Sequence, residues 1–300
     1  MNVDKRNGSV CFSEKEHIYW NDQDNGKYIS VTTLIGQFRR PFEKDFWSSY
    51  KALEKLIPKD NWNIEKKSLL NTKTFNKEIL SLYDISDETF QNTKQEILKE
   101  WDDKNKQACE RGTKIHAKLE NSMYENSNNI SLKKYGVGGK FICKKDRTEL
   151  DIPYGVYPEY LISYESKDGL LRLAGQIDLL VKSGNDITII DYKTNEKIDK
   201  KSGFNTVTKS NVKMLYPLNT LMDCNYSHYE MQLSTYAWMV EKLNPNFTIK
   251  DLILVHFDHN GNQTIYNVDY LKNEVKDMLT YYKLKVKQKR QRDLMEPIKY

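Results

Sequence analysis

The chain has 300 residues, with 47 Lys and Arg against 42 Asp and Glu, which gives a formal net charge of +5 at pH 7. This length suits one large domain or two small ones, and so small a positive excess does not identify a nucleic-acid partner by itself. It does argue against a uniformly acidic binding surface. No apolar run approaches the roughly 20 residues that cross a bilayer, so we expect no membrane partner.

Two features favour a cytoplasmic protein. The N-terminus lacks the apolar stretch of a secretory signal. The cysteines lie far apart and form no Cys-x-x-Cys pair, which is typical of free thiols in a reducing compartment rather than of a zinc site or a disulfide framework. They are Cys11, Cys109, Cys143 and Cys224.

The first elements expected along the chain are a short hairpin and a helix. Aromatic strands are predicted at 17–20 and 27–30, with turn-forming residues between them. A helix is predicted over 31–38. Its N-terminus can be capped by the side chain of Ser30 or of Thr32.

A charged, mainly helical segment follows at 51–135. From Ser86 onward apolar residues recur at helical spacing, and Gly112 interrupts this stretch, which predicts a kink or a break between two helices. We expect the chain to form a single domain. Its mainly helical front, with the N-terminal hairpin, would cover 1–135, and its core and C-terminal helix would cover 136–300.

The second half of the chain changes to strands. Apolar runs separated by short turns predict a three-strand meander, followed by a helix, two strands and a basic helix. The expected elements are strands at 154–164, 170–182 and 186–194, a helix at 229–243, strands at 252–257 and 264–268, and a helix from 271 to about 291. The chain is therefore predicted to combine α and β structure in one fold.

The two turns of the meander determine which residues face one another across its strands. If the second hairpin turns on Gly184-Asn185, a favourable pair for a two-residue loop, Asp178 lies opposite Asp191. If the first hairpin turns on Asp168-Gly169, Glu159 lies opposite Asp178. The two registers, obtained independently, place these three carboxylates in one row across three strands.

Three carboxylates in one row repel one another, because directly opposed side chains have Cβ atoms only about 5 Å apart. A hard divalent cation would offset this charge, and Lys193, two residues beyond Asp191, faces the same side of the strand. Tyr192 then points to the other face and leaves its backbone carbonyl near the row. The alternative is an exposed polar face, but the surrounding residues are apolar, and embedded carboxylates are costly unless paired or bound to metal.

Two runs in the meander resemble the motifs of a known family. Ala174-Gly175-Gln176-Ile177-Asp178 and Ile189-Ile190-Asp191-Tyr192-Lys193-Thr194 resemble the PD-(D/E)xK nuclease superfamily, above all its RecB-like branch of phage exonucleases and the mitochondrial genome maintenance exonuclease. Further matches, in order, are Ser30-Val31-Thr32-Thr33-Leu34, the G-x-x-x-H run ending at His116, Glu159, and the Q-x-x-x-Y run from Gln232 to Tyr236. The resemblance covers roughly 30–240. It implies a restriction-endonuclease-like core, in which helices flank a mixed central sheet.

The resemblance also implies roles for these residues. The metal ligands would be His116, Asp178, Asp191 and the backbone carbonyl of Tyr192. Lys193 would position or activate the attacking water and stabilise charge on the phosphate. Glu159 would be a further catalytic carboxylate, either outside the inner ligands or on a second metal.

The cleft that receives DNA would be lined by a second set of residues. Gln232 and Tyr236 are four apart and share one helical face, so they would orient the lysine or the DNA. Glu120 lies one helical turn from His116 and would orient it. The remaining expected cleft residues are Ser30, Thr32, Thr33 and Thr194.

The sequence therefore predicts a metal-dependent deoxyribonuclease, and an exonuclease rather than an endonuclease, in phage or bacterial recombination, replication or repair. Mg²⁺ or Mn²⁺ would activate water and neutralise phosphate charge. No iron–sulfur cluster is expected, since Cys224 is the one cysteine after the motifs. The expected partners are single-stranded DNA or duplex ends, and a single-strand annealing or replication protein.

Three alternatives stay open. The first is an endonuclease of the same fold. The second is a non-catalytic nucleic-acid-binding module, against which the intact set of Asp178, Asp191 and Lys193 argues. The third is a sugar- or nucleotide-processing metalloenzyme, which the D-Y-K-T strand and the Q-x-x-x-Y helix disfavour.

Overall fold

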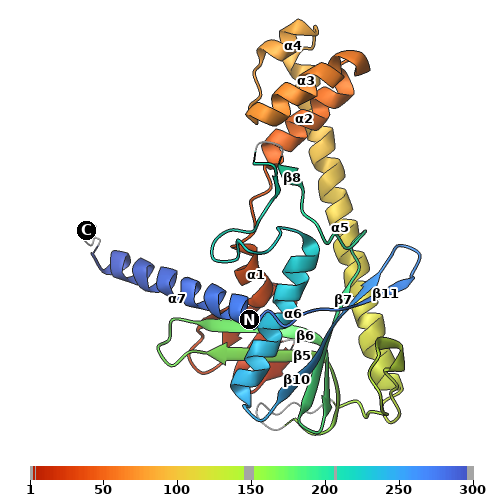
Figure 1. Ribbon diagram of the computed structural model, residues 1–300, viewed down its shortest axis with the longest axis vertical. Helices are drawn as coiled ribbons and strands as arrows, with labels where there is room; N and C mark the ends of the chain where they lie inside the picture. Colours follow the sequence, from red (N-terminus) through yellow and green to blue (C-terminus); the bar gives the residue numbers. More distant parts are fainter. Residues whose placement is uncertain (1–2, 4, 145–151, 206–207, 296–300) are drawn as a thin grey trace. The chain divides into compact units, whose positions relative to one another are not determined.

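The structure, a computed structural model, describes residues 3, 5–144, 152–205 and 208–295 (Figure 1). The chain divides into two compact units. The first unit comprises 1–39, 114–204 and 210–300, and the second comprises 40–113 and 205–209. Every helix that the structure describes is too short or too polar to cross a bilayer.

The first unit is built on a mixed sheet of nine described strands. Its centre is the antiparallel meander of β5 (Gly155–Glu165), β6 (Arg172–Ser183) and β7 (Asp186–Lys193). Strand β10 (Thr248–Phe257) pairs with β7 in parallel, and β11 (Gln263–Asn267) is the antiparallel neighbour of β10. The mixed central sheet that the family resemblance implies is therefore confirmed.

The N-terminal strands extend this sheet. An antiparallel ladder leads to the last of them, which pairs in parallel with β6 through Ile29 and Leu173. These strands are β1 (Lys5–Asn7), β2 (Val10–Ser13), β3 (Ile18–Asn21) and β4 (Lys27–Ser30). The sequence predicted the hairpin of β3 and β4 but missed the two strands before it, because they are short and the first is too polar to show a strand pattern.

Helices cover both faces of the sheet (Figure 1). The helices of the first unit are α1 (Val31–Gly36), the C-terminal part of α5 (Asp87–Glu125), α6 (Asn225–Leu243), α7 (Lys272–Met295) and the 3-10 turn η1 (Lys133–Tyr135). Two very short strands, β8 (Phe204–Asn205) and β9 (Ser210–Asn211), come between β7 and α6 in the sequence and pair with each other. Helix α1 begins as predicted, because Ser30 Oγ accepts a hydrogen bond from the Thr33 N–H at 3.0 Å.

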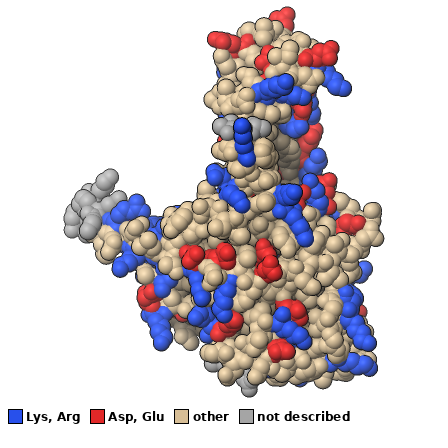
Figure 2. Space-filling model, viewed as in Figure 1, with Lys and Arg blue, Asp and Glu red and all other residues tan. Residues whose placement is uncertain are grey.

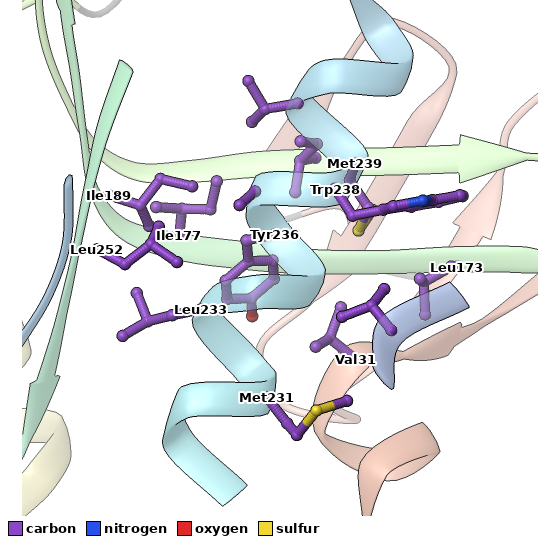
Figure 3. Close-up of a cluster of buried hydrophobic side chains, with 14 of the residues drawn as sticks. Val31, Leu173, Ile177, Ile189, Met231, Leu233, Tyr236, Trp238, Met239 and Leu252 are labelled. Atoms are coloured by element: carbon purple, nitrogen blue, oxygen red, sulfur yellow. The ribbon is translucent and has the colours of Figure 1, made fainter. Parts of the chain in front are cut away.

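Each face of the sheet is covered by its own hydrophobic core. On one face, Leu233 and Tyr236 of α6 belong to the same buried cluster as Ile189 of β7 (Figure 3). On the other face, Ile190 of β7 is buried in a second cluster, against which Ile115 of α5 packs. Because consecutive residues of a strand point to opposite faces, α6 and α5 cover opposite sides of the sheet.

The second unit is helical. It contains α2 (Lys44–Leu56), α3 (Lys59–Thr72), α4 (Glu78–Leu82) and the first part of α5. Its core includes Leu53, Trp62, Phe90 and Ile97. The predicted break at Gly112 is wrong, since α5 continues from Asp87 to Glu125. A glycine inside a helix costs only about 1 kcal/mol, and the Glu, Lys, Arg and Ala residues around it favour the helix.

Both turns of the meander have the predicted positions. Ser183 pairs with Asp186 around Gly184-Asn185, and Glu165 pairs with Arg172 around the turn that contains Asp168-Gly169. The ladder of β5 and β6 keeps this register from one end to the other. The two predicted registers are therefore confirmed, although the ladder of β6 and β7 ends at Leu179–Ile190, before the expected pair of Asp178 and Asp191.

The row of Glu159 and Asp178 departs from a regular ladder. Glu159 has φ +50, and the ladder of paired residues omits this row while continuing on both sides of it. Tyr157 and Tyr160 both lie in the core on the α6 side, although they are three residues apart. Strict alternation would place them on opposite faces, so the strand turns over at Glu159. The prediction assumed strict alternation and was wrong at this position.

Candidate active site

The site begins where β6 and β7 separate. Their ladder ends at the pair Leu179–Ile190, so Asp178 and Asp191 lie just beyond it. The N–H of Tyr192 donates to Asp178 Oδ2 at 2.6 Å. A side-chain carboxylate therefore takes a backbone donor where the ladder stops, and this contact fixes the orientation of Asp178.

A histidine joins two of the predicted acids on the α5 side of the sheet. His116 Nδ1 lies 3.5 Å from Glu159 Oε1 and 3.6 Å from Asp178 Oδ1. His116 Nε2 is 3.2 Å from the carbonyl oxygen of Tyr192. One ligand atom from each of His116, Glu159 and Asp178 lies within 4.8 Å of the other two. Helix α5 and two strands thus converge on one small group of side chains whose types can hold a metal ion.

The other predicted acid has different neighbours. Asp191 is 1% exposed, and its Oδ2 lies 2.6 Å from Lys193 Nζ. Gln232 of α6 donates from Nε2 to Asp191 Oδ1 at 3.1 Å. The ring of Tyr229, one turn before Gln232, lies 4.9 Å from Lys193 Nζ. Asp191 is therefore held by Lys193 and α6 and is not one of the three residues that cluster around His116.

The charges of the site shift its pKa values. Burial lowers the pKa of His116, but the negative charges of Asp178 and Glu159 outweigh burial and raise it to about 9. Burial raises the pKa of Asp191 to about 6, against the opposing charge of Lys193, and it also raises that of Asp178. Burial lowers the pKa of Lys193, but the charges of Asp191 and Asp178 raise it overall. The lysine therefore stays cationic at neutral pH.

The residues expected to line a cleft have varied positions. Tyr236 is buried against Gly175, where a Cβ atom would lie only 2.6 Å from Tyr236 Cε1. Ser30 caps α1, and its hydroxyl lies 3.2 Å from that of Thr32 and 2.7 Å from that of Thr33. These contacts give Tyr236 a packing partner and Ser30 a capping role.

Glu120 and Thr194 are two further residues expected in the cleft. Glu120 accepts a hydrogen bond from the hydroxyl of Tyr124, on its own helix, at 3.3 Å. This hydrogen bond is with Tyr124 and not with His116, the residue that Glu120 was expected to orient. Thr194 directly follows the last residue of β7 and is partly buried.

Three neighbours of the site were missed by the sequence reasoning. Gln176 donates from Nε2 to Glu159 Oε2, and Lys5 Nζ lies 3.6 Å from the same oxygen. Tyr229 covers the ammonium of Lys193. The period of two could have found Gln176, which precedes Asp178 by two residues. Lys5 could not have been found, because β1 itself carries too weak a pattern.

The residue types fit a divalent ion. One imidazole nitrogen and two carboxylate oxygens face one another, and hard cations such as Mg²⁺ and Mn²⁺ prefer oxygen ligands. The raised pKa values of Asp178 and Asp191 show that their charges lack full compensation from the protein. A bound cation would supply that compensation.

Comparisons with known proteins agree with this chemistry. The model of a family described as the PD-(D/E)XK nuclease superfamily matches residues 74–297. A search of curated proteins finds no match. Among solved structures, the chain is similar to SSO0001 at 15% identity and TM-score 0.32, over 85% of this chain and 76% of that one. It is similar to a predicted exonuclease from Eubacterium rectale at 11% identity and TM-score 0.32, over 87% and 79% of the two chains. These two structural overlaps are too loose to support an argument.

Proposed function

Because the chain belongs to the PD-(D/E)XK nuclease superfamily, we propose that it is a metal-dependent deoxyribonuclease of the RecB-like exonuclease branch. Its reaction would be hydrolysis of phosphodiester bonds from a DNA end, with Mg²⁺ or Mn²⁺ as cofactor. The observation that carries the proposal is the group of His116, Glu159 and Asp178 next to the ion pair of Asp191 and Lys193.

The metal would be held by His116 Nδ1, Glu159 Oε1 and Asp178 Oδ1. A bound divalent ion would neutralise charge on the scissile phosphate and lower the pKa of the attacking water. The carbonyl of Tyr192 lies at His116 Nε2, so an N–H there would donate to it and leave Nδ1 free as a ligand. We therefore propose that this carbonyl orients His116, and that the Tyr192 N–H orients Asp178.

Lys193 would act as a charged hydrogen-bond donor. The raised pKa keeps its ammonium protonated, which favours stabilisation of the developing phosphate charge over abstraction of a proton. Asp191 would position this ammonium and complete the metal ligands once the substrate phosphate attracts Lys193. Gln232 would fix Asp191 through its amide, and Tyr236 would support the strand at Gly175.

The buried site, rather than the surface charge, supports a DNA substrate. On the face drawn in Figure 2, Lys and Arg side chains are interspersed with Asp and Glu. Charge of this kind gives no single basic track on this face that a strand would follow. The proposal of DNA as substrate therefore depends on the metal-binding group and on the nuclease family to which the chain belongs.

The test is degradation of labelled DNA by the full chain. End-labelled linear single strands and duplexes are incubated with Mg²⁺, Mn²⁺ or EDTA, beside a closed circular DNA. An exonuclease shortens the linear DNA in the presence of metal and leaves the circle intact. Cleavage of the circle would indicate an endonuclease of the same fold. Binding without cleavage would indicate a nucleic-acid-binding module, and cleavage in EDTA would contradict the proposed chemistry.

The biological setting follows from this activity. We propose DNA recombination, replication or repair in the cytoplasm of a bacterium, with a gene carried by the cell or by a phage. A single-strand annealing or replication protein would be the natural protein partner. We also propose that both units of the chain serve one nuclease domain.

A further inference from the structure

The carboxylate oxygens of the α5 side differ in the donors that already contact them. Glu159 Oε2 accepts from Gln176 Nε2 and lies 3.6 Å from Lys5 Nζ, whereas Oε1 faces His116 Nδ1 at 3.5 Å. Asp178 shows the same division. Its Oδ2 accepts from the Tyr192 N–H, whereas Oδ1 faces the same His116 nitrogen at 3.6 Å. Each carboxylate therefore presents one oxygen to the group and keeps the other occupied.

Lys5 is a largely buried cation at this site. Its side chain is only 18% exposed, and its Nζ lies 3.1 Å from Glu14 Oε1 in addition to its contact with Glu159. Lysine is rarely buried unless its charge is paired. Lys5 lies in β1, outside the residues that match the family model, so its contact with Glu159 is a property of this chain rather than of the family motifs.

Two lysines thus offset part of the carboxylate charge. Lys193 pairs with Asp191 at 2.6 Å, and Lys5 pairs with Glu159. With His116 neutral, the three carboxylates and Glu14 exceed the two ammonium groups by two negative charges. One divalent ion balances this excess. A second ion would add two uncompensated positive charges to a buried site, where charge is costly.

We infer that the site takes one divalent ion, and that Lys5 supplies to Glu159 the positive charge that a second ion would otherwise bring. The inference rests on the proposed metal-dependent function. Gln176 is neutral and contacts the same Oε2, so it selects which oxygen of Glu159 turns to His116. Lys5 and Gln176 are therefore positioning residues of Glu159.

The test counts bound Mn²⁺ by equilibrium dialysis of the full chain. Wild type binds one equivalent. Lys5→Met removes the ammonium but keeps the length of the side chain, and it binds two equivalents, the second at least about tenfold more tightly than any further ion on wild type. Lys5→Arg keeps the charge and stays at one. Glu14→Gln is the matched control, because it removes the other partner of Lys5 and leaves the count at one.

The outcomes separate this inference from the proposed function. Two equivalents on wild type overturn it, and so does one equivalent on folded Lys5→Met. If wild type binds no more Mn²⁺ than Asp178→Asn, the proposed metal site fails instead. If circular dichroism shows that Lys5→Met does not fold, the number of Mn²⁺ ions bound by wild type still tests the inference. Gln176→Leu then tests the positioning, since it keeps one equivalent but binds it about tenfold more weakly, and unchanged affinity contradicts the assignment.

Discussion

The two sides of the site both carry carboxylates, but these carboxylates have different partners. On the α5 side, Glu159 and Asp178 each turn one oxygen to His116 Nδ1, at 3.5 and 3.6 Å. On the α6 side, Asp191 contacts Lys193 Nζ at 2.6 Å and the amide of Gln232 at 3.1 Å. The first side can accept a cation, whereas the carboxylate of the second already has a lysine partner.

The difference arises from the two faces of the sheet. Tyr192 lies in the core on the α5 side, while Asp191 and Lys193 alternate with it and meet α6. Asp178 and Asp191 look equivalent in the sequence, yet Asp178 lies in the group around His116 and Asp191 is paired with Lys193. If this division is right, each side can be removed without loss of the other.

Asp178→Asn should have the largest effect, because it removes charge from the metal-binding side alone. We expect the rise in Tm on adding Mn²⁺ to disappear and kcat on DNA to fall about a thousandfold. Burial raises the pKa of Asp178, so its charged form costs stability at neutral pH, and the neutral amide does not lower the Tm of the metal-free protein. Calorimetry with and without Mn²⁺ measures both effects.

The matched control is Asp186→Asn, at the start of β7 and far more exposed. It should keep the metal-induced rise in Tm. A similar rise in Asp178→Asn would remove Asp178 from the ligands.

Lys193→Met should break the α6 side alone. It leaves the charge of Asp191 buried without its partner, which costs about 3–5 kcal/mol in the free energy of unfolding. Cleavage is lost, but Mn²⁺ still binds to the α5 side. Urea unfolding and metal titration measure the two quantities.

The double variant Asp191→Asn/Lys193→Met provides the rescue. It should recover most of the stability, because no buried charge remains, and stay inactive. Loss of Mn²⁺ binding in Lys193→Met would show that the two sides are one unit.

The sequence was sufficient for the parts of the site that depend on local rules. The turns at Gly184-Asn185 and Asp168-Gly169 set both registers, and the registers placed Glu159 beside Asp178. The period of two placed Lys193 on the face of Asp191. These features follow from turn chemistry and pleat, which act over a few residues.

The missed parts depend on contacts that are distant in sequence or on local strain. A left-handed φ at Glu159 has no sequence signal, because glutamate rarely adopts it and the surrounding fold must offset a cost of about 1–2 kcal/mol. The contact of Lys5 with Glu159 joins β1 to β5, two strands that lie far apart in the sequence. The partner of Glu120 could not be chosen from spacing, since Tyr124 is as near along the helix as His116.

The pH dependence of metal binding should report the α5 side. Without metal, the pKa of His116 is raised from 6.5 to about 9, so its protonated form stabilises the fold below pH 6.5, and this contribution is lost as the pH rises through 9. A metal ion binds to His116 only when the imidazole ring is neutral, because the proton otherwise occupies the ligand nitrogen. Mn²⁺ affinity should therefore rise about tenfold per pH unit from 7 to 9 and level off above it.

Calorimetric titration of Mn²⁺ across this range measures the slope. His116→Gln, which has no proton to lose, should flatten it and is the control. A slope that persists in His116→Gln would assign the proton to another group.

Gly175→Ala should give the smallest effect and tests the α6 side through packing. The added Cβ atom would lie 2.6 Å from Tyr236 Cε1, so Tyr236 must shift, at a cost of about 1–3 kcal/mol in the free energy of unfolding. Tyr236 lies one turn after Gln232 on α6, so the shift should loosen the amide that holds Asp191 and lower kcat, while Mn²⁺ affinity stays unchanged. Gly203→Ala, where no heavy atom lies within 4 Å, is the matched control for stability. Adding Tyr236→Leu to Gly175→Ala should restore part of the stability, because the smaller side chain makes room for the Cβ atom. Weaker Mn²⁺ binding in Gly175→Ala, with Asp191 and Lys193 intact, would mean that α6 also shapes the metal-binding side.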